Sequence, residues 1–390
     1  MENKNIIYFA NDLRADHKVS SHHIAEELSK CNRILYVETG GMRKPRKSKR
    51  DMKRIFSRLF LWFKGVRKVS DNLYIYSLII FPFYGRLFRK LNICLNVFVL
   101  RRAIKKYGFT MPILWFVAPH VSYLADYIKT NLIVYYCTDN VSEMPEVDNY
   151  AVGRLEDSLL EKANIVFATS EYLCNRLKEK NRNQNISYSP HAVDYKHFCS
   201  ARDENLTVAA EVRNLKKPVI GYVGLIEKWI DLDLIGHIAR LRPDWSVVLI
   251  GRVAVPANNI DNYANVKILG TKSYEDLPSY MKGFDVCISP FKINELTRSV
   301  NPIKIKEYLS TGRPVVATRI PEMEKFKDVV EIADTYDEFV EKIENIHKSD
   351  NGENIKKRME FVKNDDWCSR VEDISKKIVN LMLNQGILGD

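Results

Sequence analysis

The chain has 390 residues, enough for two domains of ordinary size, and its composition is that of a globular protein. Its seven cysteines are widely spaced and form no Cys-x-x-Cys pair, so neither a zinc site nor a disulfide framework is indicated. The formal net charge is +11, and no uninterrupted apolar run is long enough to span a bilayer. The first apolar run, residues 6–10, is too short for the core of a signal peptide, so we expect a cytoplasmic protein.

The N-terminal half alternates short apolar runs with polar segments. A helix is predicted from Ser20 or Ser21, where a serine can cap it, to Lys30. The apolar runs predict strands at 6–10, 33–38, 73–77, 113–117, 132–137, 165–169 and 186–189.

A basic segment interrupts this half of the chain. Between Arg43 and Lys68 there are twelve Lys and Arg residues against one acid, Asp51, so this segment carries the net charge of the whole chain. Apolar residues at 55–63 recur within it at helical spacing, and 81–90 shows a similar pattern. Such a segment is typical of a helix that lies on anionic lipid, and the alternative is a solvated basic loop beside a buried helix. The residues expected to contact the membrane are Arg43, Lys44, Lys47, Arg50, Lys53, Arg54, Phe60 and Trp62.

The C-terminal half shows a more regular alternation of strands and helices. Helices are predicted at 231–241, at 274–284, and from Pro302 to Thr311, with Gly312 ending the last of these. Buried strands are predicted at 218–224, 245–251, 265–270, 285–291 and 314–318. This order predicts a doubly wound α/β domain, in which ligands bind outside the carboxyl ends of the parallel strands.

The domain boundaries are predicted from polarity. A polar segment at 194–217 separates the halves, so we expect domains at 1–200 and 201–365. The remainder, 366–390, reads as a helix that we expect to pack back on the N-terminal domain.

The helix predicted from Pro302 could hold a nucleotide. Its first turn offers unpaired backbone N–H groups, which suit a diphosphate. Lys304 and Glu307 share one face, where Glu307 could accept hydrogen bonds from a ribose diol. The alternative is a solvent-exposed helix with an ordinary Lys–Glu pair.

The segment 299–317 resembles the sugar-nucleotide-binding motif of GT-B-fold glycosyltransferases of the group 1, family 4 type. That motif has two glutamates separated by seven residues and then Gly-x-Pro-Val-Val. Glu307 matches the second glutamate and 312–316 match the tail, while Ser299 stands where the first glutamate would be. A variant in teichuronic-acid and exopolysaccharide transferases, Asn-Pro-x-Lys-x-x-Glu-Tyr-Leu, is matched by Asn301, Pro302, Lys304, Glu307, Tyr308 and Leu309.

Other segments agree with this resemblance. Residues 222–229 resemble the family's glycine-rich first loop of the donor domain, and 189–198 resemble its hinge. The resemblance implies two doubly wound Rossmann-like domains facing across a cleft, with 1–200 facing the acceptor and membrane and 201–365 binding the nucleotide sugar. The donor-binding residues that it implies are Glu307, Lys304, Asn301, Pro302, Ile303, Ser299, Lys228, Arg252 and Gly224.

Candidate catalytic residues lie in the N-terminal half. Asp139 and His120 each follow a predicted strand, and a carboxylate or histidine is the usual base for activating an acceptor hydroxyl. The family often has a histidine at the position of His120. Further acceptor-side candidates are His17, His22 and Glu143, although a lone histidine is more often a surface or capping residue.

The expected activity is transfer of a sugar from a nucleotide diphosphate sugar to a lipid-linked or polymeric glycan acceptor, at the inner face of the cell membrane. We find no metal-ligand constellation and no Asp-x-Asp pair of the kind that holds a diphosphate, so we expect neither metal nor cofactor. Positive side chains and the helix dipole would then stabilise the leaving diphosphate. Nucleic acid is not expected as a partner, because no nucleic-acid-binding module is visible.

Two other functions fit parts of the sequence. A nucleotide-sugar 2-epimerase shares the fold and the donor but needs no lipid-facing surface. A non-catalytic protein that binds membrane or polyanions would need the basic segment alone.

Overall fold

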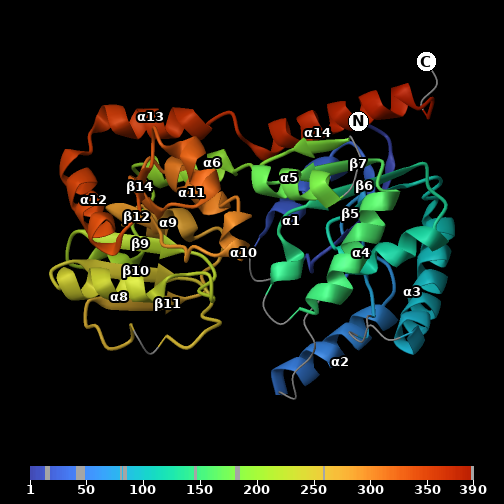
Figure 1. The fold of residues 1–390 in the computed structure, drawn as a ribbon, viewed down its shortest axis with the longest axis horizontal. Coiled ribbons are helices and arrows are strands. Elements are labelled where there is room, and N and C mark those ends of the chain that lie inside the picture. Colours follow the sequence, from blue (N-terminus) through green and yellow to red (C-terminus); the bar gives the residue numbers. More distant parts are fainter. Residues whose placement is uncertain are drawn as a thin grey trace. The chain divides into compact units, whose positions relative to one another are not determined.

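The computed structural model describes residues 1–13, 18–40, 49–79, 81, 86–144, 147–180, 185–257 and 260–387. The chain divides into two compact units. Unit 1 comprises Met1–Pro190 and Arg370–Asp390, and unit 2 comprises His191–Ser369. Each unit is built around one sheet of mainly parallel strands that is joined by helical connections, as Figure 1 shows.

The sheet of unit 1 has the strand order β3-β4-β2-β1-β5-β6-β7-β8. Strand β3 runs antiparallel to β4, and the other neighbours are parallel. The elements of this unit are β1 (Asn5–Ala10), α1 (Ser20–Ser29), β2 (Arg33–Glu38), α2 (Lys49–Phe63), β3 (Arg67–Lys68), β4 (Leu73–Ser77), α3 (Arg86–Tyr107), β5 (Ile113–Phe116), η1 (Pro119–Tyr127), β6 (Leu132–Cys137), η2 (Val141–Glu143), α4 (Asn149–Lys162), β7 (Ile165–Ala168), α5 (Glu171–Lys180), β8 (Ile186–Tyr188) and most of α14 (Trp367–Asn384).

The sheet of unit 2 has the order β11-β10-β9-β12-β13-β14, and its neighbouring strands are parallel. This order is the one typical of doubly wound nucleotide-binding sheets, and its direction reverses between β9 and β12. The elements of this unit are α6 (Tyr195–Cys199), η3 (Ser200–Arg202), α7 (Ala210–Arg213), β9 (Val219–Val223), α8 (Leu232–Leu241), β10 (Ser246–Ile250), β11 (Val266–Gly270), α9 (Leu277–Met281), β12 (Val286–Ser289), α10 (Glu295–Arg298), α11 (Ile303–Ser310), β13 (Val315–Thr318), η4 (Pro321–Phe326), β14 (Glu331–Ala333), α12 (Tyr336–Ser349) and α13 (Gly352–Val362).

The sheet of unit 2 is buried on both faces, which explains its continuous apolar strands. Alternate residues of β9 belong to different cores: Val219 and Val223 pack with α9 and α11, whereas Ile220 and Tyr222 pack with α8 and α12. The helices therefore cover the two faces in separate layers. This arrangement leaves the ends of the strands as the place where polar loops can gather.

The predicted fold class is confirmed, since both units are α/β with parallel sheets. The strands expected in both halves form, with ends that differ by a few residues at most. The helix expected at 274–284 is shorter and spans Leu277–Met281. Pro278 in its first turn and Gly283 after its end restrict the regular part to these residues.

The two ends of unit 2 are joined by a small polar cluster. The ammonium group of Lys306, which is buried in α11, contacts both the carbonyl of His191 and the carboxylate of Asp365. The main chain of Val193 also donates a hydrogen bond to the Asp365 carbonyl at 3.0 Å. The points at which the chain enters and leaves this unit are therefore held side by side.

Gly251 allows the loops after β9 and β10 to approach closely. Its φ angle is +144°, and a Cβ atom at this position would lie 1.8 Å from the carbonyl oxygen of Gly224. Only glycine adopts this backbone region readily, and any side chain would separate the two loops.

We therefore expect Gly251→Ala to lower the free energy of unfolding by about 2 kcal/mol or more. Chemical denaturation measures this change. The matched control is Gly153→Ala in α4, where a Cβ atom would meet nothing within 4 Å, and where alanine should stabilise the helix slightly. Equal stability of the two variants would show that the loop contact is not required.

Candidate functional site

The candidate donor site lies at the carboxyl edge of the sheet in unit 2, where the strand order reverses. Strands β9 and β12 are neighbours there and end at Val223 and Ser289. Gly224 follows the first strand, and helix α11 begins after the second. In a doubly wound sheet, this crevice is where ligands bind.

Tyr308 fixes α11 against the end of β9. Its side chain is fully buried, and its hydroxyl group accepts a hydrogen bond of 2.8 Å from the N–H of Val223 and donates one of 3.2 Å to the carbonyl of the same residue. Ile305 and Leu309 pack beside it in the core. The rest of α11 is therefore positioned relative to the loop that starts at Gly224.

The loops after β9 and β10 pair with each other. The N–H of Gly224 donates to the carbonyl of Ile250 at 2.8 Å, and that of Ile226 donates to the carbonyl of Arg252 at 3.0 Å. Ala254 returns a hydrogen bond of 2.8 Å to the carbonyl of Ile226. Gly224 and Arg252, two of the predicted donor-binding residues, therefore lie on two loops that are joined by main-chain hydrogen bonds.

The loop after β9 also pairs with the loop after β12. Lys292 N–H donates to the carbonyl of Trp229, and Asp231 N–H donates to the carbonyl of Pro290, each at 2.8 Å. Lys228, predicted to reach the donor phosphates, is an exposed side chain on this paired loop. Its ammonium group is thus carried by an ordered main chain at the carboxyl edge of the sheet.

The first turn of α11 has the features expected of an anion site. Its N-cap is Pro302, which makes no side-chain capping hydrogen bond, so the N–H groups of Ile303 and Lys304 have no side-chain cap. The ammonium group of Lys304 lies 2.7 Å from a carboxylate oxygen of Glu307, whose side chain is 5% exposed. The predicted Lys304–Glu307 pair exists, and its carboxylate is buried at the site and not directed into solvent.

Ser299 and Asn301 precede this helix and are both buried. The hydroxyl group of Ser299 donates to the carbonyl of Leu296 at 2.7 Å. The amide nitrogen of Asn301 donates to a carboxylate oxygen of Glu322 at 2.9 Å. Sequence reasoning did not select Glu322, although it follows the predicted strand at 314–318 and so reaches the same edge.

The sequence contains one Asp-x-Asp pair, Asp231-Leu-Asp233. Asp231 is the N-cap of α8, where it accepts a hydrogen bond from the N–H of Leu234 at 3.2 Å and from the hydroxyl of Tyr336 at 2.8 Å. These contacts give Asp231 a structural role. Within the described ranges, no three His, Cys, Asp or Glu side chains gather as a group that could hold a metal ion.

The catalytic candidates of unit 1 lie at the carboxyl edge of its own sheet. His120 follows β5 and Asp139 follows β6, and these two strands are neighbours. The Nε2 atom of His120 lies 3.5 Å from the carbonyl oxygen of Thr39, which follows β2. Burial, and to a lesser extent the charge of Arg58, lowers the pKa of His120 to about 4, whereas burial raises the pKa of Asp139. At neutral pH His120 is therefore uncharged.

The remaining acceptor-side candidates occupy different positions. His22 is buried at the start of α1, and its Nδ1 atom accepts a hydrogen bond of 3.4 Å from the N–H of Val19, so it acts as a cap. Burial lowers the pKa of His22 to about 4. Glu143 is an exposed side chain at the end of η2, and His17 lies outside the described residues.

The predicted membrane residues are only partly described. Arg43, Lys44 and Lys47 lie outside the described residues, and the described side chains do not include Arg50, Lys53 or Arg54. Phe60 is exposed on α2. Trp62 lies on the opposite side of the helix, partly buried against the core of unit 1.

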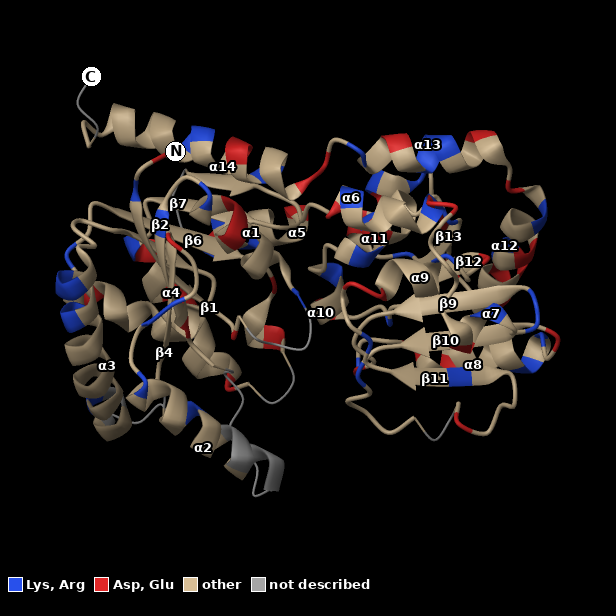
Figure 2. Cartoon of the chain, turned by 180° about the vertical axis from the view of Figure 1, so that it is seen from behind, with Lys and Arg blue, Asp and Glu red and all other residues tan. Residues whose placement is uncertain are grey.

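Helix α2 is attached to the carboxyl edge of the unit 1 sheet by Arg58. The guanidinium group forms an ion pair with Asp12, in the loop after β1, and donates to the carbonyl of Leu78 at 3.4 Å. It also lies so close to Gly40 that a Cβ atom there would be 2.8 Å from the guanidinium carbon. Figure 2 colours the described Lys and Arg residues blue. No helix among the described residues is long and apolar enough to cross a membrane.

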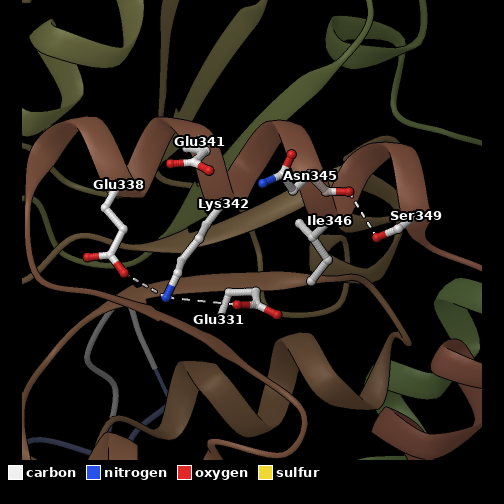
Figure 3. Close-up of a pocket in the computed structure, with 7 residues that line it drawn as sticks. All are labelled: Glu331, Glu338, Glu341, Lys342, Asn345, Ile346 and Ser349. Carbon is white, nitrogen blue, oxygen red and sulfur yellow. Dashed lines mark hydrogen bonds and ion pairs between the residues drawn. The ribbon is translucent and has the colours of Figure 1, made fainter.

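A hollow of about 370 Å³ lies elsewhere in unit 2, between α12 and β14 (Figure 3). Its charged lining is mainly acidic, with Glu331, Glu338 and Glu341 around Lys342, and Lys342 is already paired with Glu338 at 2.9 Å. An acidic lining repels a diphosphate, so this hollow is not a candidate donor site.

The sequence of this chain is similar to known glycosyltransferase sequences. Residues 217–349 match the family described as glycosyl transferases group 1. A Bacillus subtilis (strain 168) protein, named as the teichuronic acid biosynthesis glycosyltransferase TuaH, is 24% identical over 231 residues. That match covers 55% of this chain and 57% of the relative, so the chain spans little more than half of the relative's length.

Solved structures resemble nearly the whole chain. Sucrose-phosphate synthase from Thermosynechococcus elongatus has a TM-score of 0.72 at 15% identity, covering 98% of this chain and 100% of that one. Anabaena HepE, in complex with UDP and glucose, has a TM-score of 0.65 at 14% identity, covering 97% and 100%. These likenesses show that the fold is GT-B, as the sequence predicted.

The two buried histidines predict a pH-dependent stability. Because the pKa values of His22 and His120 lie below the ordinary value, the unfolded chain binds their protons more tightly than the folded chain does. Stability should be complete above about pH 6.5 and fall towards pH 4, by at most about 1.4 kcal/mol per pH unit for each histidine. Denaturant unfolding between pH 4.5 and 7.5 measures this slope.

His120→Gln should reduce the slope, since glutamine takes up no proton in this range. His347→Gln, at an exposed position of α12, is the control and should leave the slope unchanged. An unaltered slope in the His120 variant would contradict the assignment.

Proposed function

We propose that this chain, in which residues 217–349 match the glycosyl transferases group 1 family, transfers a sugar from a nucleotide diphosphate sugar to a glycan acceptor. Unit 2 would bind the donor and unit 1 the acceptor. The observation that carries this proposal is α11, which places an uncapped helix start and the buried carboxylate of Glu307 at the carboxyl edge of the sheet. This combination suits the two halves of a nucleoside diphosphate, its phosphates and its ribose.

The charges around this edge support the donor assignment. Lys304 lies in the first turn of α11, Arg252 lies in the paired loops, and Lys228 is exposed on the loop after β9. Positive groups fixed near a leaving diphosphate stabilise its charge in the transition state. We propose that these three residues do so without a metal ion, in a transfer of the hexosyl type.

The acceptor assignment rests on the residues that follow β5 and β6. Burial raises the pKa of Asp139, which makes it a stronger base than an ordinary carboxylate. His120 is uncharged at neutral pH and can accept a hydrogen bond from a hydroxyl group. We propose that Asp139 removes the proton of the acceptor hydroxyl and that His120 helps to hold that hydroxyl.

The nature of the acceptor is proposed from an exposed apolar surface on α2. Phe56, Phe60 and Phe63 are 65%, 60% and 77% exposed, which is unusual for phenylalanine on a folded domain. Lys64 lies over the ring of Phe60, 4.4 Å from its centroid, as expected where aromatic and basic groups meet a lipid surface. We propose a lipid-linked glycan acceptor at the cytoplasmic face of the membrane, reached by a protein that binds the surface peripherally.

The donor site is tested with Glu307→Ala. Loss of a buried carboxylate that binds a ribose diol should abolish measurable binding of nucleotide sugars, because both hydroxyl groups lose their acceptor. Isothermal titration calorimetry with a panel that includes UDP-glucose, UDP-N-acetylglucosamine and GDP-mannose measures this directly. UDP-glucose belongs in the panel because HepE has been solved in complex with it.

Glu341→Ala, in the hollow beside α12, is the matched control and should bind the same donors as the wild-type protein. Undiminished binding by the Glu307 variant would remove the assigned role of Glu307. A wild-type protein that binds no member of the panel would contradict the proposed function itself.

The membrane proposal is tested with a triple change of Phe56, Phe60 and Phe63 to serine. Because the three rings would enter the lipid interface, their removal should lower flotation with anionic phospholipid vesicles at least about fivefold. Donor binding should be unaffected. The control is a double change of Leu241 and Phe361 to serine, which removes exposed apolar side chains from unit 2. Equal flotation of both variants would contradict the role of α2.

A further inference from the structure

Asn301 carries a buried acceptor that no group in the described structure uses. The residue lies between β12 and α11 and is 5% exposed. Its side-chain oxygen Oδ1 has no hydrogen-bond partner among the described residues. A buried carbonyl oxygen without a partner costs about 1–3 kcal/mol, so its presence calls for an explanation.

The orientation of this amide is fixed by Glu322. The amide nitrogen Nδ2 of Asn301 lies 2.9 Å from the carboxylate, and an ionised carboxylate can only accept hydrogen bonds. The nitrogen must therefore face Glu322. Because the amide is planar, Oδ1 is turned to the other side.

Glu322 is itself held in place. Its side chain is 2% exposed and accepts hydrogen bonds of 3.1 and 3.3 Å from the ammonium group of Lys325, one turn further along η4. The neighbouring hydroxyl of Ser299 is directed to the carbonyl of Leu296 and does not compete for the amide of Asn301. The structure thus keeps the Asn301 oxygen in one orientation next to the start of α11.

The order of groups along the segment suggests which part of a donor molecule this oxygen meets. A nucleotide sugar consists of ribose, diphosphate and sugar in sequence. Glu307 lies one turn into the helix, where the proposed function places the ribose, and the uncapped N–H groups at Ile303 and Lys304 suit the diphosphate. Asn301 comes before the helix in the chain. It therefore lies on the other side of the proposed diphosphate position from Glu307, where the sugar would lie. Ionised phosphates have no proton to donate, whereas sugar hydroxyl groups do.

We propose that Asn301 Oδ1 accepts a hydrogen bond from a hydroxyl group of the transferred sugar, and that Glu322 is the positioning residue that orients the amide for this contact. The inference rests on the proposed function and adds to it a residue that selects the sugar. A site built to bind a hydroxyl group discriminates strongly against donors that lack it, because the buried acceptor is then left unpaired.

The experiment compares two ligands on the full chain by calorimetry. One ligand is whichever of UDP-glucose, UDP-N-acetylglucosamine and GDP-mannose binds the wild-type protein most tightly, and the other is the matching nucleoside diphosphate. Asn301→Ala should weaken binding of the nucleotide sugar about tenfold and that of the nucleoside diphosphate less than twofold, because only the first ligand carries the sugar hydroxyl.

Glu322→Gln is the second variant. A glutamine side chain can offer either its N–H or its carbonyl group, so the Asn301 amide would no longer be held in one orientation. The same selective loss is expected, with a smaller magnitude. Asn345→Ala, at an exposed position of α12, is the matched control and should bind both ligands as the wild-type protein does.

Each outcome has a separate meaning. An equal loss of both ligands in the Asn301 variant would overturn the inference, since a contact to the nucleotide or a purely structural role moves both affinities together. Unchanged affinities would overturn it as well. In either case, retention of nucleotide-sugar binding by the wild-type protein leaves the proposed function standing, whereas a wild-type protein that binds neither ligand would contradict both.

Discussion

The hydroxyl group of Tyr308 is the contact on which the candidate donor site depends. It satisfies both main-chain groups of Val223 at the point where β9 ends and the polar loops begin. These hydrogen bonds fix the position of the helix that carries Lys304 and Glu307 relative to the strand that leads into Gly224. Because the phenol ring is also part of the apolar core, the same side chain joins the packing of unit 2 to the geometry of its carboxyl edge. The hydroxyl group of this core tyrosine therefore positions the start of α11, which has no capping side chain.

Unit 1 depends in a similar way on Arg58, whose guanidinium group joins α2 to the loop after β1 and to the end of β4. The charge of Arg58 also contributes to the low pKa of His120, so the helix with the exposed aromatic face and the candidate acceptor site share one cation. Any displacement of α2 would move this charge. The exposed aromatic surface of α2 and the electrostatics of the candidate acceptor site are therefore linked through a single side chain.

The sequence was sufficient to predict twelve of the strands, because buried parallel strands leave continuous apolar runs, and the start of α11 is signalled by Pro302 and its end by Gly312. It did not predict the short strands β3 and β14, or the helices α4, α5, α12 and α13. The sequence also predicted that Glu307, Asn301 and Gly224 lie at the carboxyl edge of the unit 2 sheet, since these residues follow predicted strands. It could not predict which polar groups pair across the sheet. Glu322 lies 21 residues after Asn301 in the chain, and its place after a predicted strand does not show which side chain it contacts. Trp62 was predicted to face lipid because its spacing fits the apolar face, but periodicity alone does not show which side of α2 meets the core.

The polar cluster of Lys306, His191 and Asp365 has a consequence for how such a chain can evolve. Unit 2 is an insertion within unit 1, and this cluster together with the main-chain bond from Val193 to Asp365 holds both of its boundaries at one place. A module whose two ends are adjacent can be exchanged between proteins without stretching either junction. The bond that joins those ends comes from α11, the helix of the candidate donor site. Unit 2 therefore contains both the candidate donor site and the contacts that hold its two ends together, and a recombination event that transfers the one transfers the other.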